Sequence, residues 1–189
     1  IVSSTLEIRS SWTTLEARCV EWSGLFITEA DLDSQRGAIP SAVSESDNIV
    51  EAAKLLGVAK PKHEPSESEW IALNSLAKEV TSTSKMLSHH EDSIREISAA
   101  YLPSLSALMG PLSAAKLVVL AGSRERLARM PSGSLQVLGA HAAMSAHRRG
   151  APPPKHGVVL FSMPQVSRSP RWVRGKIARF LAGKASIAV

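Results

Sequence analysis

The first hundred residues carry two long heptad patterns, in which apolar positions recur alternately every three and every four residues. In the first pattern every seam position except Thr5 is apolar, and the seam consists of Ile1, Thr5, Ile8, Trp12, Leu15, Cys19, Trp22 and Phe26. Charged residues such as Glu7, Arg9 and Glu16 lie between the seam positions, as on the solvent-facing side of a helix. This spacing predicts a long helix that packs against a second helix along a narrow apolar seam.

The second pattern begins at a capping box, in which Ser66 is followed three residues later by Glu69. Its seam consists of Leu73, Leu76, Val80, Thr83, Leu87, His90, Ile94, Ile97 and Tyr101. Pro103 follows directly and should end or bend the helix. A helix over residues 66–101 would be about 54 Å long at 1.5 Å per residue. Two such helices in one chain should pack antiparallel, and we interpret His90 as a residue that fixes their register rather than as a ligand.

Residues between the two patterns are expected to contain a short helix. Residues 47–57 have the composition of such a helix, closed by Gly57. The flanking segments, Asp31 to Pro40 and Ala59 to Glu64, are rich in polar residues, Gly and Pro and are predicted to be loops.

The second half of the chain consists of short apolar segments separated by Gly and Pro. Gly110-Pro111 should open a helix that Gly122 ends, and Ser123 should cap the next turn. Pro131 breaks the pattern, after which Ser132 or Ser134 can cap a helix that runs to about Arg149 and that Gly150 closes.

The end of the chain is predicted to contain two extended stretches and one further helix. Residues 151–154 include three consecutive prolines and should be stiff and extended, and residues 158–161 should form a short, buried, extended stretch. Ser169 caps the last helix and Pro170 starts it, with Val173, Ile177, Phe180 and Leu181 expected inside. The sequence thus predicts an all-α fold, with a coiled-coil hairpin in residues 1–102 and a compact helical domain in residues 103–189.

The formal net charge of +5 hides a strong asymmetry between the two halves. Residues 1–109 contain nine Lys and Arg against sixteen Asp and Glu, whereas residues 110–189 contain thirteen Lys and Arg and a single acid, Glu125. Because the basic half is also rich in Leu, Val and Ala, it should be folded, and such a charge excess is typical of a surface that meets phosphates. A basic surface without a nucleic-acid ligand is the alternative.

The basic residues gather at expected helix ends and connections rather than along one helical stripe. They are Arg124, Arg126 and Arg129; Arg148 and Arg149; Lys155 with His156; and Arg168, Arg171, Arg174, Lys176 and Arg179. Short helices that end near one another could bring several of these groups onto one face, which would suit a bent phosphate backbone. Aromatic residues are few, which favours readout of shape and backbone over readout of base sequence.

The sequence offers little for catalysis or for metal binding. Cys19 is the one cysteine and lies on the coiled-coil seam, so no internal disulfide can form and an intracellular setting is favoured. The six histidines are not accompanied by a cluster of carboxylates or cysteines. There is no phosphate-binding Gly-rich loop and no nucleophile-elbow motif. We therefore expect no enzymatic activity, no metal and no cofactor.

Several short strings in residues 100–188 resemble one known family. The strings are Gly110-Pro111, Ala115-Lys116-Leu117, Ala121-Gly122-Ser123, Arg129-Met130-Pro131, Gln136-Val137-Leu138-Gly139-Ala140, Pro153-Pro154-Lys155-His156-Gly157 and Arg174-Gly175-Lys176-Ile177-Ala178-Arg179. Together they resemble the Nop domain, found in the core protein of archaeal and nucleolar box C/D ribonucleoproteins and in a related spliceosomal factor. The hairpin is similar to the coiled-coil domain of this family in its pattern only.

The resemblance implies a module that grips a kink-turn RNA together with a small ribosomal-protein-like protein already bound to it. The RNA-contacting positions of the family map to Arg129, to the turn at Ser132 and Gly133, and to Lys155 and His156. Further candidates are Arg174, Lys176 and Arg179, one of which should cap carbonyls or pair with Glu125, and the helix-end pair Arg148 and Arg149. Trp172 is interpreted either as a residue that stacks on RNA or as one that packs against the base of the hairpin.

The resemblance also bears on partners and on the cellular compartment. The coiled coil serves the family in self-association or in binding other ribonucleoprotein components. Because the family's domain that recruits the fibrillarin methyltransferase is not in this sequence, we expect a fibrillarin-type methyltransferase to be a doubtful partner. The expected setting is intracellular, cytoplasmic in an archaeon and nuclear or nucleolar in a eukaryote. The alternative function is a coiled-coil dimerisation or interaction scaffold whose basic half binds an acidic protein.

Overall fold

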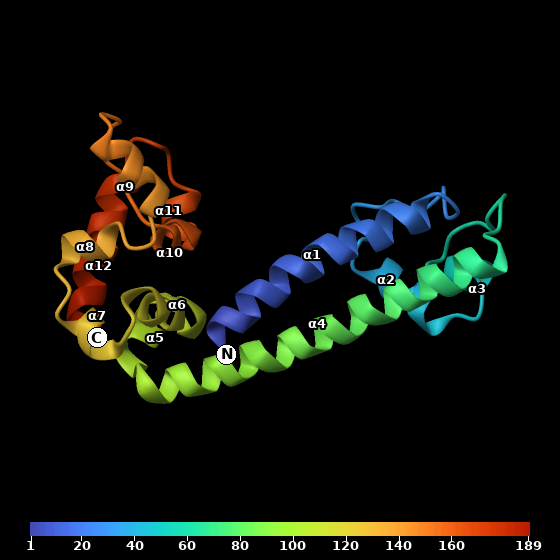
Figure 1. Ribbon diagram of the computed structural model, residues 1–189, viewed down its shortest axis with the longest axis horizontal. Coiled ribbons are helices and arrows are strands. Elements are labelled where there is room, and N and C mark those ends of the chain that lie inside the picture. The colour runs from blue at the N-terminus through green and yellow to red at the C-terminus, as the bar shows by residue number, and fades with distance from the viewer. The chain divides into compact units, whose positions relative to one another are not determined.

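The computed structural model describes residues 1–189, and all of its regular secondary structure is helical (Figure 1). In chain order the helices are α1 (Val2–Gly24), α2 (Ala38–Glu45), α3 (Ile49–Leu55), α4 (Glu67–Tyr101), α5 (Pro103–Met109), α6 (Pro111–Ala121), α7 (Arg124–Ala128), α8 (Ser132–Gln136), α9 (His141–Arg148), α10 (Val158–Ser162), α11 (Pro164–Ser167) and α12 (Arg174–Ala188). The prediction of an all-α fold is confirmed.

The chain forms two compact units. The first is Ser3–His90, here called the hairpin unit, and the second is Glu91–Val189 together with Ile1–Val2, here called the C-terminal unit. The predicted division at residues 102 and 103 coincides with the break between α4 and α5, whereas the compact units divide within α4. The assignment of residues 1–102 and 103–189 as domains therefore stays a prediction.

Within the hairpin unit, α1 and α4 lie side by side and run in opposite directions (Figure 1). The indole Nε1 of Trp12 donates a hydrogen bond to the Val80 carbonyl at 3.1 Å, and Thr5 Oγ1 lies 3.5 Å from His90 Nδ1. Since residue numbers rise along one helix as they fall along the other, these contacts fix an antiparallel register. His90 thus has the register-setting contact that its position on the seam predicted.

Helices α2 and α3 widen the apolar core at one end of the hairpin. There the buried cluster consists of Cys19, Val20, Ile27, Ile39, Val43, Ile49, Ala52, Ala53, Leu73, Ala77 and Val80. The predicted loop Asp31 to Pro40 is wrong at its end, because α2 begins at Ala38 and contains Pro40 in its first turn, where a proline needs no N–H partner. The short helix expected within residues 47–57 is present as α3, with the Asn48 side chain accepting from the Glu51 N–H at 3.0 Å.

The thiol of Cys19 is buried in the hairpin unit. This burial raises the pKa of Cys19 from 9.0 to about 11, so the thiol stays protonated and weakly nucleophilic near neutral pH. Nearby on α1, the buried Glu16 carboxylate accepts from Arg36 Nε at 2.9 Å, which ties the turn before α2 to the helix. Cys19 therefore acts as a small core residue.

Both ends of α4 follow the rules that predicted them. The Ser66 N–H donates to the Glu69 carboxylate at 2.8 Å, and the Glu69 N–H donates to Ser66 Oγ at 3.4 Å, which completes the capping box. The helix ends at Tyr101, and Pro103 takes the first position of α5. The last two predicted seam positions, Ile97 and Tyr101, are exposed, while Ser98 is buried and accepts from Ser106 Oγ through its carbonyl.

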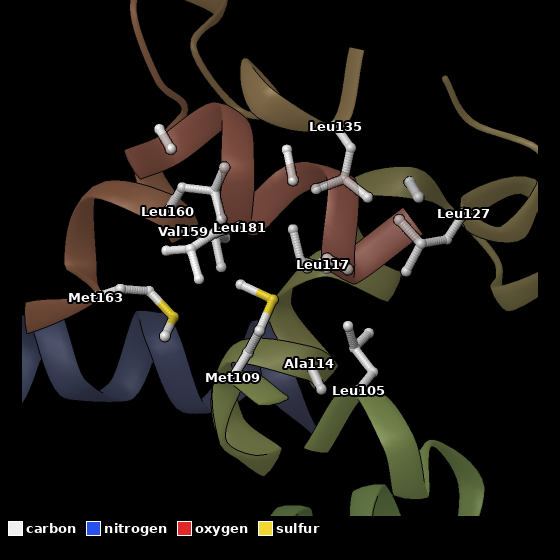
Figure 2. Close-up of a cluster of buried hydrophobic side chains, with 14 of the residues drawn as sticks. Leu105, Met109, Ala114, Leu117, Leu127, Leu135, Val159, Leu160, Met163 and Leu181 are labelled. Atoms are coloured by element: carbon white, nitrogen blue, oxygen red, sulfur yellow. The ribbon is translucent and has the colours of Figure 1, made fainter. Parts of the chain in front are cut away.

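The C-terminal unit is built around α12, which packs against α5, α7, α8, α10 and α11. Figure 2 shows its core, which is made of aliphatic side chains and methionines. The buried residues are Leu102, Leu105, Met109, Ala114, Leu117, Ala121, Leu127, Leu135, Val159, Leu160, Met163, Val166, Ala178, Leu181, Ala182 and Ala185. Three alanines on the buried face of α12 let the neighbouring helices approach closely.

Helices α5 and α6 form a sharply bent apolar pair. Gly110, with φ of +80°, lies between them, and the two axes differ by 115°. Only when taken together are they long and apolar enough to cross a membrane, and no single helix of the chain is. Several of their apolar side chains, among them Leu105 and Leu117, lie in the core of the C-terminal unit.

The helix predicted from Ser132 or Ser134 to Arg149 is wrong, because two helices occupy these residues. Helix α8 ends at Gln136, and Gly139, with φ of +82°, breaks the path before α9 begins. A Cβ at Gly139 would come within 2.7 Å of Val158 Cγ2, so the break is also a close packing point. Neither serine caps α8, whose N-cap residue is Pro131.

Two further predictions for the end of the chain are corrected. Residues 158–161 are helical rather than extended, because they open α10, and only Val159 and Leu160 among them are buried. The last helix begins at Arg174, after a turn in which the Val173 N–H bonds the Pro170 carbonyl at 3.0 Å, and Ser169 does not cap it. Leu181 is buried as expected, Val173 and Ile177 are half-buried, and Phe180 is exposed.

Gly157 holds the proline-rich turn against the end of α8. Its N–H donates to the Gln136 carbonyl at 2.7 Å, and a Cβ at this position would lie only 1.9 Å from the Leu138 carbonyl oxygen. That obstacle is backbone and cannot rotate away. The close approach therefore demands glycine for space, although the backbone angles of Gly157 are open to any residue.

We predict that Gly157→Ala destabilises the C-terminal unit by about 2 kcal/mol or more, since the turn must move away from α8. Gly183→Ala on α12 is the matched control, because a Cβ there meets nothing within 4 Å. It should stabilise the chain by about 0.5–1 kcal/mol through the lower entropy of the unfolded state. Urea unfolding followed by circular dichroism measures both changes. Equal stabilities of the two variants would contradict the close approach.

Candidate functional site

An open groove of about 700 Å³ lies on the C-terminal unit where α8, the proline-rich segment and α12 meet. Its walls come from three separate parts of the chain. The lining residues are Gln136, Val137, Pro152, Pro153, Pro154, Lys155, Trp172, Gly175, Lys176, Arg179 and Phe180. The consecutive prolines give one wall a fixed backbone without internal hydrogen bonds.

Gln136 joins the three walls of the groove. Its side-chain Nε2 donates to the Lys155 carbonyl at 2.7 Å, and the Gly175 carbonyl lies 3.4 Å from the same nitrogen. A Cβ at Gly175 would lie 3.5 Å from Lys155 Cβ, so the stem of this lysine rests on the first turn of α12. Gln136 belongs to one of the short strings that resemble the family, but no sequence signal marks a lone glutamine as a positioning residue, and it was not predicted as one.

Three of the predicted RNA-binding cations line this groove together. Lys155 comes from the proline-rich turn, and Lys176 and Arg179 come from one face of α12, three residues apart. All three side chains are exposed, and no Asp or Glu is among the lining residues. Concentrated positive charge without a carboxylate makes the groove suited to an anionic ligand.

His156 and Arg174 meet at a different place, around the ring of Phe161. The imidazole stacks on Phe161 with ring centroids 4.7 Å apart, and the guanidinium carbon of Arg174 lies 5.6 Å from the Phe161 centroid. Arg174 also donates to the carbonyls of Ser169 and Ser167, each at 2.8 Å. One of the three basic residues Arg174, Lys176 and Arg179 was expected to cap carbonyls or to pair with Glu125. Arg174 is the one that caps carbonyls.

Arg129, at the end of α7, and Ser132 and Gly133, the first two residues of α8, flank the connection between these helices. All three are exposed and lie outside the groove lining. Glu125 lies in the first turn of α7, four residues before Arg129. The pKa of its carboxyl lies below its ordinary value because its own backbone N–H and the Ser123 hydroxyl hydrogen-bond to it, and because Arg124 and Arg129 lie nearby. The ionised Glu125 therefore offsets part of the positive charge at this connection.

Arg148 and Arg149 are exposed at the end of α9 and do not line the groove. The chain leaves this helix through Gly150, with φ of +101°, and the His147 ring Nδ1 lies 2.7 Å from the Ala151 carbonyl oxygen. The predicted binding residues are therefore spread over the groove, the Phe161 cluster, the α7–α8 connection and the end of α9, and only the first brings three cations together.

The groove contains two aromatic side chains that the sequence analysis treated differently. Trp172, for which two interpretations were open, is 76% exposed, and Phe180, expected in the core, is 64% exposed. The spacing of apolar residues on α12 did not reveal that Phe180 is exposed, because small alanines fill the core positions instead.

No group of three or more His, Cys, Asp or Glu side chains lies close enough together to hold a metal ion.

The chain is similar to several curated proteins. A NOP5 family protein of Methanocaldococcus jannaschii is 49% identical over 87 residues, which cover 46% of this chain and 21% of that protein. Nucleolar protein 58 of Mycosarcoma maydis is 31% identical over 144 residues, covering 76% and 25%. Human nucleolar protein 56 is 34% identical over 121 residues, covering 64% and 20%. The chain thus spans about a fifth to a quarter of the length of these relatives.

A solved structure resembles the chain over almost its whole length. It is a chain in the crystal structure of a fibrillarin/Nop5p complex, with a TM-score of 0.51 and 26% sequence identity, and the match covers 99% of this chain and 64% of that one. The expectation that a fibrillarin-type methyltransferase is a doubtful partner is therefore wrong. The likeness to a protein from a fibrillarin complex includes both the hairpin and the C-terminal unit.

The family model for Nop, described as "snoRNA binding domain, fibrillarin", matches residues 23–189. This match begins near the end of α1 and contains all of the groove residues. It agrees with the resemblance of the short strings in the second half. The chain therefore belongs to the Nop family of RNA-binding ribonucleoprotein domains.

Proposed function

We propose that the C-terminal unit binds a kink-turn RNA that already carries a small ribosomal-protein-like protein, within a ribonucleoprotein. The observation that carries this proposal is the groove, in which Lys155, Lys176 and Arg179 converge without a carboxylate. Phosphate groups are the ligands that such a cluster favours, and the family membership indicates that the phosphates belong to RNA.

The location of the charge supports the C-terminal unit as the RNA-binding part. Residues 3–90 contain thirteen acidic side chains and only eight Lys and Arg, so the net charge of this unit is negative and it repels a phosphate backbone. Residues 110–189 carry thirteen Lys and Arg and one acid, Glu125, whose negative charge interacts with the nearby Arg129. Electrostatic attraction therefore directs RNA to the second half of the chain.

The spread of basic groups supports a folded rather than a straight RNA. A straight duplex would be expected to meet one continuous stripe of cations, whereas here the cations come from the proline-rich turn, from α12 and, at Arg129, from the end of α7. Backbone segments that leave a sharp bend in different directions can reach such separate positions. Shape and backbone contacts then carry the recognition.

We further propose that the chain assembles with a fibrillarin-type protein, since it matches a chain from a fibrillarin/Nop5p complex over 99% of its length. The acidic hairpin unit serves as the protein-binding part in this proposal. The protein would act in the nucleolus of a eukaryotic cell, as the names of its relatives suggest, or in the cytoplasm of an archaeon.

We expect the chain to bind a preformed complex of kink-turn RNA and its ribosomal-protein-like partner at least about tenfold more tightly than the bare RNA. The partner protein holds the RNA in its bent form, so the chain does not bear the free-energy cost of bending. Gel shifts with labelled RNA, with and without the partner protein, measure the two affinities. Equal affinities would reject the composite site, and no RNA binding at all would favour a scaffold that binds an acidic protein.

Removal of two groove charges should reduce the salt dependence of RNA binding. For Lys155→Ala with Lys176→Ala, we expect the slope of log K against log salt concentration to fall in magnitude by about two, one for each lost phosphate contact. The matched control is Lys78→Ala with Lys85→Ala, which removes the same charge from exposed positions of α4 in the hairpin unit. Slopes that are equal in the two double variants would exclude the groove lysines from the phosphate contacts.

Assembly with fibrillarin is tested by copurification of the full chain with purified fibrillarin, followed by size-exclusion chromatography. We expect a stable complex that forms without RNA and that survives the Lys155→Ala and Lys176→Ala changes, because the basic groove is reserved for RNA. A complex that forms only when RNA is added would contradict direct assembly. This result would leave the RNA-binding proposal intact.

A further inference from the structure

The aromatic residues of the C-terminal unit are all at its surface. They are Tyr101, Phe161, Trp172 and Phe180, and each is at least 40% exposed, while the core contains only aliphatic side chains and methionines. An aromatic ring gains more than most side chains from burial, so its placement on the surface calls for another use. In the hairpin unit, by contrast, Trp12, Trp22, Phe26 and Trp70 pack against the core.

Two of these exposed rings line the basic groove. Trp172 lies in the turn before α12, and Phe180 lies on α12 itself, next to Arg179. The ammonium group of Lys184 is 5.6 Å from the Phe180 ring centroid. The groove therefore combines aromatic surface with cations, and its volume of about 700 Å³ falls in the range of sites for small organic ligands, about 300–1,000 Å³.

We propose that this groove binds unpaired nucleotides of the RNA, whose bases stack on Trp172 and Phe180 while Lys155, Lys176 and Arg179 contact their phosphates. Aromatic faces beside a cationic groove are the means by which proteins hold single-stranded nucleic acid. Bases within a helix are already stacked on one another and cannot use these rings. The inference rests on the proposed RNA binding and adds that the segment in the groove is single-stranded.

The residues around the groove favour RNA over a protein ligand. No carboxylate lines it, and three cations from two segments do, so a ligand must supply several negative charges as well as flat apolar groups. A nucleotide carries both within one repeating unit. Stacking is also tolerant of base identity, in keeping with a groove that offers only one side-chain amide, that of Gln136, which already donates to the Lys155 carbonyl.

Binding of two RNA probes to the full chain tests this inference. One probe is a fluorescently labelled single-stranded octamer of uridine, and the other is a twelve-base-pair RNA duplex. For Trp172→Ala with Phe180→Ala, we expect binding of the octamer to weaken by about 5- to 150-fold for each base that loses its ring. Binding of the duplex should change less than twofold. The single variant Trp172→Phe, which keeps both aromatic faces, should retain most of the wild-type affinity for the octamer.

Two controls separate stacking from other effects. Ile187→Ala removes an 83% exposed apolar side chain from the same helix and should leave both affinities unchanged. The salt slope for the octamer should be the same in the wild type and the aromatic double variant, because no phosphate contact is lost. Circular dichroism checks that the variants, changed only at exposed positions, keep the helical fold.

The outcomes distinguish this inference from the proposal on which it rests. Loss confined to the single-stranded probe supports stacking in the groove. If the wild type binds RNA and the double variant binds both probes as well as the wild type, or loses both equally, stacking is overturned and RNA binding stands. If the wild type binds neither these probes nor the kink-turn complex, both proposals fail.

Discussion

The C-terminal unit depends on how closely backbone segments approach α12 and α8. Ala178, Ala182 and Ala185 give α12 a narrow buried face, so five other helices can pack around it. At the end of α8, Gly157 brings the proline-rich turn directly against the Leu138 carbonyl. On α12, alanines thus occupy most of the inner positions, and the leucines, valines and methionines of the neighbouring helices fill the rest of the core around them.

The alanines on the buried face of α12 also explain why charged and aromatic side chains of this helix lie at the surface. Because alanines occupy most of the inner positions of α12, three of its larger residues, Lys176, Arg179 and Phe180, lie outside and on one side. Another basic residue of the same helix, Arg174, stabilises the fold by donating to two carbonyls before α12. The different roles of the cations on α12 become visible only once the hydrogen bonds are known.

Local rules predicted much of the fold but not its less regular parts. The capping box at Ser66, the break at Pro103 and the cap at Ser123 depend on neighbours in sequence, and each is present. The break at Gly139 depends on contact with Val158, nineteen residues away, and Phe180 is exposed because alanines fill the core. Similarly, the strings around Lys155 and Arg174 contain residues that line the groove, whereas the convergence of Lys155 with Lys176 and Arg179 depends on tertiary packing that spacing cannot reveal.

The amide of Gln136 links the shape of the groove to its charge. It donates hydrogen to carbonyls of two different segments, Lys155 and Gly175, and a carboxylate at this position has no hydrogen to donate. Deamidation, the slow ageing reaction that converts glutamine to glutamate, would set an anion against both carbonyl oxygens and among the cations of the groove. A single loss of ammonia would therefore loosen the walls and weaken the attraction for phosphate in the same step.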